Sequence, residues 1–310
     1  MQATPTTPTA ASTAWPTSGF AAEGNRRLRG VGGHLRDHPK LIVGLLLLFC
    51  YLTAGLLGPL VVDLDEADPM SVMPDSPPSR DLPFGSDSQG RSLLALTVSG
   101  IPLTLQVGLQ AGAIGLGIGI ILGFVSGYLG GPVDTIIRSL ADIMLTVPGL
   151  LVLIVIAASV RGLVSIQVIS LVVASLAWMW PTRTIRAQVL SLRERPYVEM
   201  AKLNGLSPFK IITKELIPNL LPYLGASFVG AVGSAILAAI GLEALGLGPQ
   251  HEPTLGMTVY WAIYYSALLR GLWWWWAAPV GVIVVLFVAL FLLASGLDEV
   301  ANPRLRRGAS

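Results

Sequence analysis

The chain has 310 residues, of which 53% are hydrophobic and only 12% are charged, and its formal net charge is +2. In soluble domains about a quarter of the residues are charged, so this composition excludes an ordinary soluble protein. Lipid is therefore the solvent for most of the chain. The small net charge also argues against a nucleic-acid-binding protein, which needs a strongly basic surface.

The N-terminal segment precedes any apolar run. Residues 1–20 are rich in Thr, Pro, Ala and Ser and show no periodicity. Such a composition cannot bury enough apolar surface to offset the entropy lost on ordering, so residues 1–40 are predicted to form a disordered tail. The first apolar run extends from Leu41 to Val62, which is longer than the core of a signal peptide. It is expected to remain as a membrane anchor.

Six apolar stretches meet or approach the roughly twenty residues that a helix needs to cross a bilayer core of about 30 Å. Continuous apolar runs favour helices over barrel strands, because each lipid-exposed segment must satisfy its own backbone hydrogen bonds. We predict an all-α integral membrane protein with six transmembrane helices, an outer loop at 63–102, a core of five spans at 103–298 and a tail at 299–310. The predicted spans are Leu41–Val62, Leu103–Leu129, Ile136–Val160, Leu163–Trp180, Leu220–Ile240 and Ala277–Gly296.

The distribution of Lys and Arg predicts the orientation of these spans. Sixteen of the twenty basic residues fall on the side that holds both termini and the loop 183–219, and four fall on the other side, at Arg80, Arg91, Arg161 and Arg270. Basic residues favour the cytoplasmic side, so both termini and the loop 183–219 are expected to be cytoplasmic. The loop 63–102 carries seven carboxylates, of which Asp87 is the last, and it is expected to be external.

The second span is rich in glycine. Gly112, Gly115, Gly119, Gly123 and Gly127 recur at steps of three and four residues, which predicts that another helix approaches this one closely. A dinucleotide-binding loop is excluded, since no strand precedes these glycines and no polar loop contains them.

Two groups of residues in or near the spans are candidates for the translocation path or for external contacts. Asp142 lies one turn after Arg138, so a salt bridge at the cytoplasmic edge is favoured over a role in transport. The aromatic residues Trp261, Tyr264 and Tyr265 precede the run Trp273–Trp276. This run is interpreted as an interfacial belt, with stacking on a solute as the alternative.

The sequence contains no G-x-x-x-x-G-K-[ST] loop, so the chain is not expected to hydrolyse ATP itself. Its three histidines lack the spacing and the cysteine partners of a metal site, so no catalytic residue, metal or cofactor is predicted. The energy for any transport must come from a partner protein or from a gradient.

The loop 183–219 is the most informative segment. Pro196 can begin a short helix that Gly205 can end, and Ser207 with Pro208 can begin a second one before Pro218. The result would be two short helices separated at a glycine, on a segment with seven Lys or Arg against three Glu. Such a unit could lie on anionic lipid or serve as a docking site for a cytoplasmic protein.

This loop resembles the E-A-A…G…I…L-P-N loop of ATP-binding-cassette importer permeases. Met200 replaces the middle alanine, and Glu215 stands where related permeases often carry histidine. The resemblance extends over most of the chain and points to the dipeptide and oligopeptide permeases, through Phe84–Arg91, Leu245–Gly248 and Asn302–Arg306. The matching positions of the loop are Glu199, Ala201, Gly205, Ile211, Pro218 and Asn219.

The resemblance implies a multi-pass permease of the type I importer fold in the inner (plasma) membrane. It implies a second permease subunit, two ATPase subunits that use ATP and Mg, and an external solute-binding protein. The loop 183–219 would couple the permease to the ATPases, with Glu199 contacting a partner group or, alternatively, pairing with Arg195 within the loop. Tyr197 belongs to the same expected coupling surface.

Peptides are the solute that the resemblance implies, and oligosaccharides or nickel are the alternatives. Two other classes stay open from the residues alone. A gradient-driven secondary transporter would be expected to show more spans or charged residues at the membrane midplane. A membrane scaffold would explain the docking loop but not the six glycine-rich spans.

Overall fold

The computed structural model describes residues 38–160 and 162–301. Within them the chain forms helices and no strand, and one isolated antiparallel bridge joins Ser86 and Ser92. Most of the predicted tail 1–40, Arg161 and the segment Asn302–Arg306 lie outside the described residues. All the helices belong to the compact unit Lys40–Ser310, apart from the first residue of α3. The elements are α3 (Pro39–Leu57), η2 (Gly58–Leu60), η3 (Leu64–Ala67), α4 (Leu93–Leu129), α5 (Gly131–Thr146), α6 (Gly149–Ser159), α7 (Ile166–Ala177), α8 (Met179–Arg193), α9 (Pro196–Leu203), α10 (Pro208–Ile211), the π-helical turn η4 (Ile212–Leu216), α11 (Ile217–Glu243), α12 (Leu255–Tyr264) and α13 (Trp273–Ala301).

Four helical segments of the described chain are long and apolar enough to cross a membrane, namely Pro39–Leu60, Leu93–Leu129, Pro208–Glu243 and Trp273–Val300. They coincide with the first, second, fifth and sixth predicted spans. The third and fourth correspond to bent pairs, with an angle of 87° between α5 and α6 and of 41° between α7 and α8. The described chain therefore has four candidate spans, or up to six if each bent pair is one span.

Prolines bear on two of the differences from the predicted boundaries. Helix α4 begins at Leu93 rather than Leu103, since Pro102 lies inside the helix instead of before it. The prediction of an unbroken helix from Ile136 to Val160 is wrong at Val147, whose backbone is extended with φ −85° and ψ 132°. Val147 precedes Pro148, and the proline ring disfavours a helical conformation of the residue before it.

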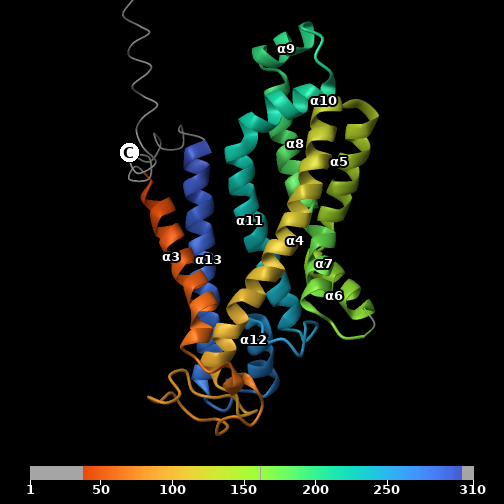
Figure 1. Ribbon diagram of the computed structural model, residues 1–310. Helices are drawn as coiled ribbons and strands as arrows, with labels where there is room; N and C mark the ends of the chain where they lie inside the picture. The colour runs from red at the N-terminus through yellow and green to blue at the C-terminus, as the bar shows by residue number, and fades with distance from the viewer. Residues whose placement is uncertain (1–37, 161, 302–310) are drawn as a thin grey trace, which may run out of the picture. The chain divides into compact units, whose positions relative to one another are not determined.

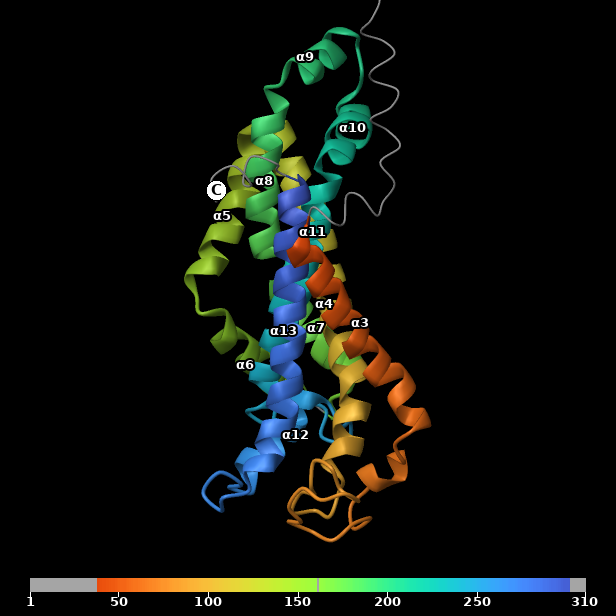
Figure 2. The same ribbon diagram turned by 90° about the vertical axis from the view of Figure 1, so that its left-hand side faces the viewer.

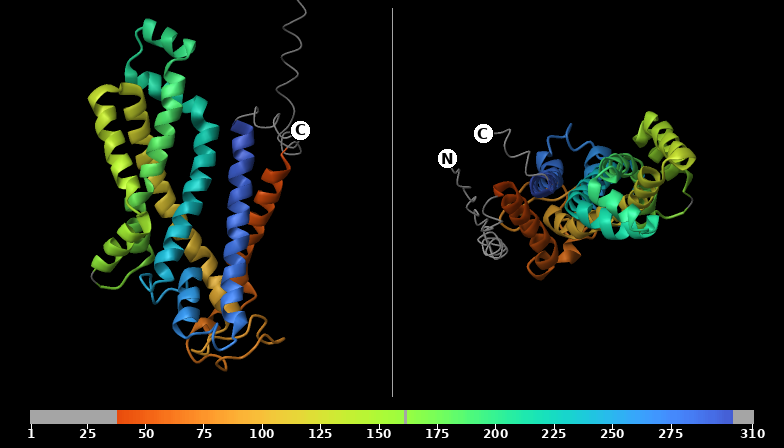
Figure 3. Two further views of the ribbon diagram at one scale, coloured as in Figure 1. Left: turned by 180° about the vertical axis from the view of Figure 1, so that it is seen from behind. Right: turned by 90° about the horizontal axis from the view of Figure 1, so that it is seen from above.

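Helix α4 lies at the centre of the bundle (Figure 1). Helices α3 and α13 lie on one side of it, and α5 to α8 lie on the other, with α11 beside α4 (Figure 3). Helices α9 and α10 form one end, whereas α12 and the loop after α3 form the opposite end (Figure 2). Helix α3 begins and α13 ends on the side of α9, where Lys40 Nζ contacts Glu299 Oε1 at 2.6 Å.

The glycines of α4 let two neighbouring helices contact its backbone directly. A Cβ atom at Gly119 would lie 2.5 Å from the Cβ of Pro181, and one at Gly127 would lie 2.9 Å from that of Val189, both on α8. On another side of α4, Gly112 faces the backbone of Val232 on α11 at 2.9 Å. The predicted close approach of helices to this span is confirmed.

Candidate functional site

The segment Arg195–Leu216 projects from one end of the bundle, and we call it the knob (Figure 1). Pro196 is in the first turn of α9, as predicted, and Arg195 before it is extended, with φ −81° and ψ 144°. Helix α9 ends at Leu203, and Gly205 after its C-cap residue has a φ of +74°, in the left-handed region. The Gly205 N–H donates to the Lys202 carbonyl at 2.9 Å, and the Leu206 N–H donates to the Ala201 carbonyl at 3.2 Å. These two bonds are a Schellman motif, so the predicted glycine break is confirmed.

One face of the knob is fixed to the bundle. Val198 and Leu216 are fully buried, and they belong to the same hydrophobic cluster as Ile185 and Val189 of α8. Ala201 and Ile211 are also buried in this cluster, so two of the predicted coupling residues hold the knob in place rather than facing outwards. The knob is therefore a folded unit with a defined position on α8 and α11.

The other face of the knob exposes apolar side chains. The exposed fraction is 37% for Tyr197, 58% for Met200, 77% for Leu203 and 75% for Phe209. Exposed apolar residues that gather on one small projection are typical of a protein or membrane contact. This surface could therefore bind a partner without any rearrangement of the buried face.

The polar residues predicted for this site lie on the exposed face as well. Glu199 and Arg195 are exposed, and neither forms an ion pair with any residue that the structure describes, so the alternative Arg195–Glu199 pair is not formed. Partial burial raises the pKa of the Tyr197 phenol above its ordinary value, and the Glu215 carboxylate raises it further while Arg195 lowers it. The phenol therefore stays protonated and able to donate a hydrogen bond.

Pro218 and Asn219 lie in the first turn of α11, directly after the knob. Both are exposed, and Asn219 Nδ2 donates to the Glu215 carbonyl at 2.6 Å. This bond joins the π-helical turn to the first turn of α11. The knob is thereby continuous with a helix that runs through the bundle to its opposite end (Figure 1).

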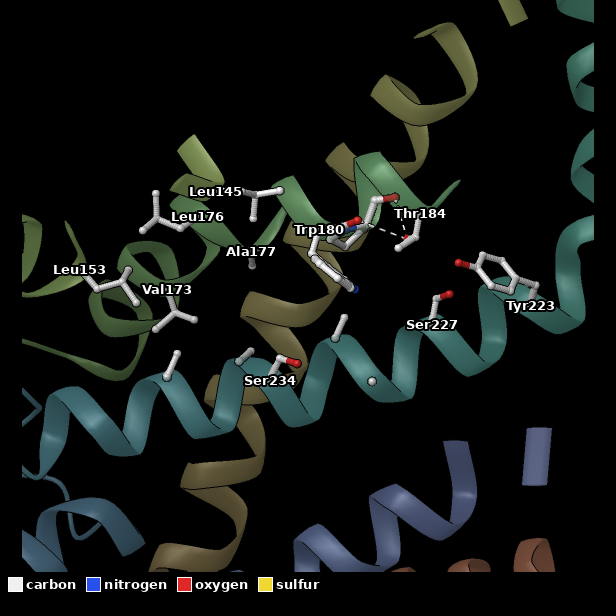
Figure 4. Close-up of a pocket in the computed structure, with 15 residues that line it drawn as sticks. Leu145, Leu153, Val173, Leu176, Ala177, Trp180, Thr184, Tyr223, Ser227 and Ser234 are labelled. Carbon is white, nitrogen blue, oxygen red and sulfur yellow. Dashed lines mark hydrogen bonds between the residues drawn. The ribbon is translucent and has the colours of Figure 1, made fainter. Parts of the chain in front are cut away.

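An open cavity of about 390 Å³ lies between α11 and the bent pairs α5–α6 and α7–α8 (Figure 4). Tyr223, Ser227 and Ser234 of α11 face the cavity from one side, and Trp180 and Thr184 of α8 face it from the other (Figure 4). None of its lining residues is Asp, Glu, His, Lys or Arg. Sequence reasoning missed this site, since its walls come from helices far apart in the chain.

Asp142 is not part of this cavity lining. Its Oδ2 lies 3.4 Å from Arg138 Nε, so the predicted pair one helical turn apart is confirmed. Its Oδ1 also lies 3.9 Å from Arg183 Nη1 on α8. Because the Asp142 side chain is 42% exposed, this trio is a surface contact between α5 and α8.

The aromatic residues predicted as path or external contacts gather at the opposite end of the bundle. The ring centroids of Trp261 and Tyr264 are 5.7 Å apart in an edge arrangement, and those of Tyr265 and Trp275 are 5.8 Å apart and stacked. Trp275 is fully buried, whereas Trp273 is 59% exposed. The run of tryptophans is therefore not a simple interfacial belt, because one member belongs to the core.

Glu243, at the end of α11, is a buried carboxylate that the sequence reasoning overlooked. The Thr254 hydroxyl donates to its Oε2 at 2.8 Å, and Thr254 is itself the N-cap of α12. A Cβ atom at Gly256 would lie 2.1 Å from the same Oε2, and one at Gly248 would lie 2.5 Å from Glu243 Cγ. The one sequence signal that could have indicated Glu243 is its position as an acidic residue directly after the fifth apolar run. Glu243 fastens the segment between α11 and α12 to the bundle.

The motif Phe84–Arg91 is also built around a buried acid. Asp87 Oδ1 accepts from the backbone N–H groups of Gln89 and Arg91 at 2.8 and 2.9 Å, and its Oδ2 contacts Arg91 Nε at 2.6 Å. Trp274 Nε1 donates to the Ser86 carbonyl at 3.2 Å, which ties this turn to α13. The motif therefore shapes the loop that covers one end of the bundle.

Comparison with known proteins identifies the family of this helical bundle. Residues 117–307 match the family described as "Binding-protein-dependent transport system inner membrane component". The chain belongs to this family. The match begins in α4 and includes α5 to α13, so the knob and the cavity both lie within it.

Curated relatives of this inner membrane component extend the match towards the N-terminus. The dipeptide transport system permease protein DppC of Bacillus subtilis is 30% identical over 88% of this chain and 84% of its own length. The oligopeptide transport system permease proteins OppC of Mycobacterium bovis and of Bacillus subtilis are 29% and 28% identical, over 92% and 88% of this chain and 98% and 88% of theirs. The resemblance to peptide permeases is confirmed, and with its apolar helices the chain is a multi-pass membrane protein of a transport permease family.

Within the described residues no group of three or more His, Cys, Asp or Glu side chains is placed to hold a metal ion.

Proposed function

We propose that this chain is a transmembrane subunit of an ATP-binding-cassette importer and forms half of a translocation pathway for peptides delivered by an external solute-binding protein. The family and the dipeptide and oligopeptide permeases among its relatives support this proposal. The observation that carries it is the knob. A folded projection with an exposed apolar face stands at one end of a helix whose middle lines a cavity in the bundle.

The orientation that this function requires is supported by the positions of the basic residues. In the described chain the end that carries α9 holds nine of them, and the opposite end holds Arg80, Arg91 and Arg270. We propose that the knob and both termini are cytoplasmic, in a six-span type I permease of the inner (plasma) membrane. The nine residues are Lys40, Arg138, Arg183, Arg186, Arg193, Arg195, Lys202, Lys210 and Lys214.

The proposed assembly contains a second permease subunit, two ATPase subunits and the solute-binding protein. The ATPase subunits bind and hydrolyse ATP with Mg, and this chain is a non-catalytic subunit. Each permease would seat its knob in a groove of one ATPase. We propose that the predicted loop 183–219 is the coupling segment of the core 103–298.

In this mechanism the residues of the knob divide into two groups. Arg195, Tyr197 and Glu199 are exposed and would contact the ATPase, together with the apolar face. Ala201 and Ile211 are buried and would transmit a displacement of α9 to the bundle. ATP binding would draw the ATPases together and favour one state of the bundle over the other, which is a shift between two conformations by differential binding.

Reconstitution of the complete complex in lipid vesicles tests this function. Uptake of a labelled peptide that requires both ATP and the binding protein is the expected result. Uptake driven by an ion gradient without ATP would identify a secondary transporter instead, and absence of any uptake by a fully assembled complex would favour a scaffold. Parallel assays with an oligosaccharide and with nickel separate the solute classes.

A further inference from the structure

We propose that the hydroxyl-bearing face of α11, formed by Tyr223, Ser227 and Ser234, is the part of the pathway that contacts the main chain of the translocated peptide. The inference rests on the proposed function and adds to it the recognition chemistry within the membrane. It starts from the cavity between α11 and the bent helix pairs, which these three side chains enter (Figure 4).

The first observation is that these hydroxyls have no partner. Elsewhere in the bundle Ser170, Ser175 and Thr182 donate to backbone carbonyls three or four residues earlier, at 2.6 to 2.8 Å. No hydrogen bond joins the hydroxyls of Tyr223, Ser227 or Ser234 to any residue that the structure describes. Ser234 is exposed and Tyr223 and Ser227 are partly exposed, so these hydroxyls are available to water or to a solute in the cavity.

The second observation is the spacing of the three residues along one helix. They lie four and seven positions apart, which keeps them on one face of α11. At 1.5 Å per residue, Tyr223 and Ser234 are separated by about 16 Å along the axis. An extended peptide rises about 3.3 Å per residue, so the face matches a stretch of about five peptide residues.

The third observation is chemical. A hydroxyl can both donate and accept, so it can pair with either the N–H or the C=O of a peptide unit. Gly230 and Ala231 between the hydroxyls leave room for a backbone to approach α11, and the opposite wall is formed by apolar side chains such as Leu153 and Val173. The lining has no charged side chain. The hydroxyls would therefore bind the main chain of a peptide without selecting for the charges of its side chains.

Cysteine labelling in the reconstituted complex tests the proposal. Single cysteines replace Ser227 or Ser234 in a background with Cys50→Ser, and a water-soluble thiol reagent is applied with and without an alanine pentapeptide. Ile236→Cys is the buried control, since Ile236 is fully buried and lies on the opposite face of α11. Phe291→Cys is the control for the outer surface of the bundle, since Phe291 lies on the candidate span α13 and away from the cavity, where lipid should exclude a water-soluble reagent.

We expect the cysteines at 227 and 234 to react faster than both controls. Peptide at about ten times its Kd should slow their reaction roughly tenfold, and the control rates should not change. As a second readout, Ser234→Leu should reduce peptide uptake by the assembled complex and Ser234→Thr should retain it.

Reaction at 227 and 234 no faster than at the controls, or a rate that the peptide leaves unchanged, would overturn the proposal, provided that the Cys50→Ser complex still imports peptide with ATP. Failure of that parent complex to import peptide would instead overturn the proposed function. The two failures are therefore distinguishable in one preparation.

Discussion

Replacing Gly205 by valine should uncouple the knob from its partner. At φ +74° an L residue pays about 1–2 kcal/mol, and a β-branched residue fits this region worst. No atom lies within 4 Å of a Cβ placed at Gly205, so the cost is in the backbone and not in a clash. A penalty of about 1–2 kcal/mol shifts the equilibrium between the folded and the unwound turn by a factor of about 5–30.

The assay is ATP-dependent peptide uptake by the assembled complex, normalised to inserted protein. Gly205→Val should lower uptake by up to that factor, whereas Gly205→Asn should retain most of it, because asparagine tolerates the left-handed conformation. Co-purification of the ATPase subunits should fall in parallel, since the unwound turn would misplace Tyr197 and Glu199.

Gly271 provides a matched control. Its φ is +75°, its surroundings are equally open, and it lies between α12 and α13 at the opposite end of the bundle. Gly271→Val should carry the same strain but leave ATPase co-purification intact. Equal loss of co-purification in both variants, or normal uptake by a well-inserted Gly205→Val protein, would refute the reasoning.

Three further predictions concern other residues. Glu199→Lys should reduce the stimulated ATP turnover of the complex roughly tenfold, which corresponds to about 1.4 kcal/mol of lost docking energy, and an unchanged rate would remove Glu199 from the docking surface. A cysteine at Gly205 should resist an impermeant thiol reagent on intact cells and one at Glu252 should react; labelling at 205 would invert the topology and exclude contact with an ATPase. Glu243→Ala should destabilise the purified protein by about 1–3 kcal/mol because the Thr254 hydroxyl loses its acceptor, and Glu243→Gln, which keeps an acceptor oxygen, should cost less; equal thermal midpoints for all three proteins would contradict the fastening role.

The sequence predicted the knob well because its signals are local. A proline in the first turn of α9 marks the start of this short helix, and a glycine after its last turn marks its end. Both residues lie within about ten positions of each other, so no distant contact is needed to predict the helix. The same holds for Asp142 and Arg138, which one helical turn brings together. Such features depend on residues that are close in the sequence, so they can be predicted without knowledge of the tertiary contacts.

Features that depend on tertiary contacts could not be predicted in this way. The length of the apolar run predicted the third span but not its bend at Val147, which precedes Pro148. Pro102, by contrast, lies inside the continuous helix α4. A proline in an apolar run therefore does not by itself determine whether the helix breaks. The burial of Trp275 depends on Tyr265 packing against it. The cavity forms where residues of α11 and α8 face each other. The sequence pattern of either helix alone does not indicate which of its faces meets the other helix.

The glycines of α4 hold this helix against two neighbours at once. Towards α8, the backbone of α4 at Gly119 and Gly123 lies against Pro181 and Ile185. Towards α11, its backbone at Gly112 lies against the backbone of Val232. Such close packing resists sliding of one helix past another, and both α8 and α11 share a hydrophobic cluster with the buried face of the knob. A displacement of α9 is therefore expected to move α4, α8 and α11 together rather than to be absorbed between them.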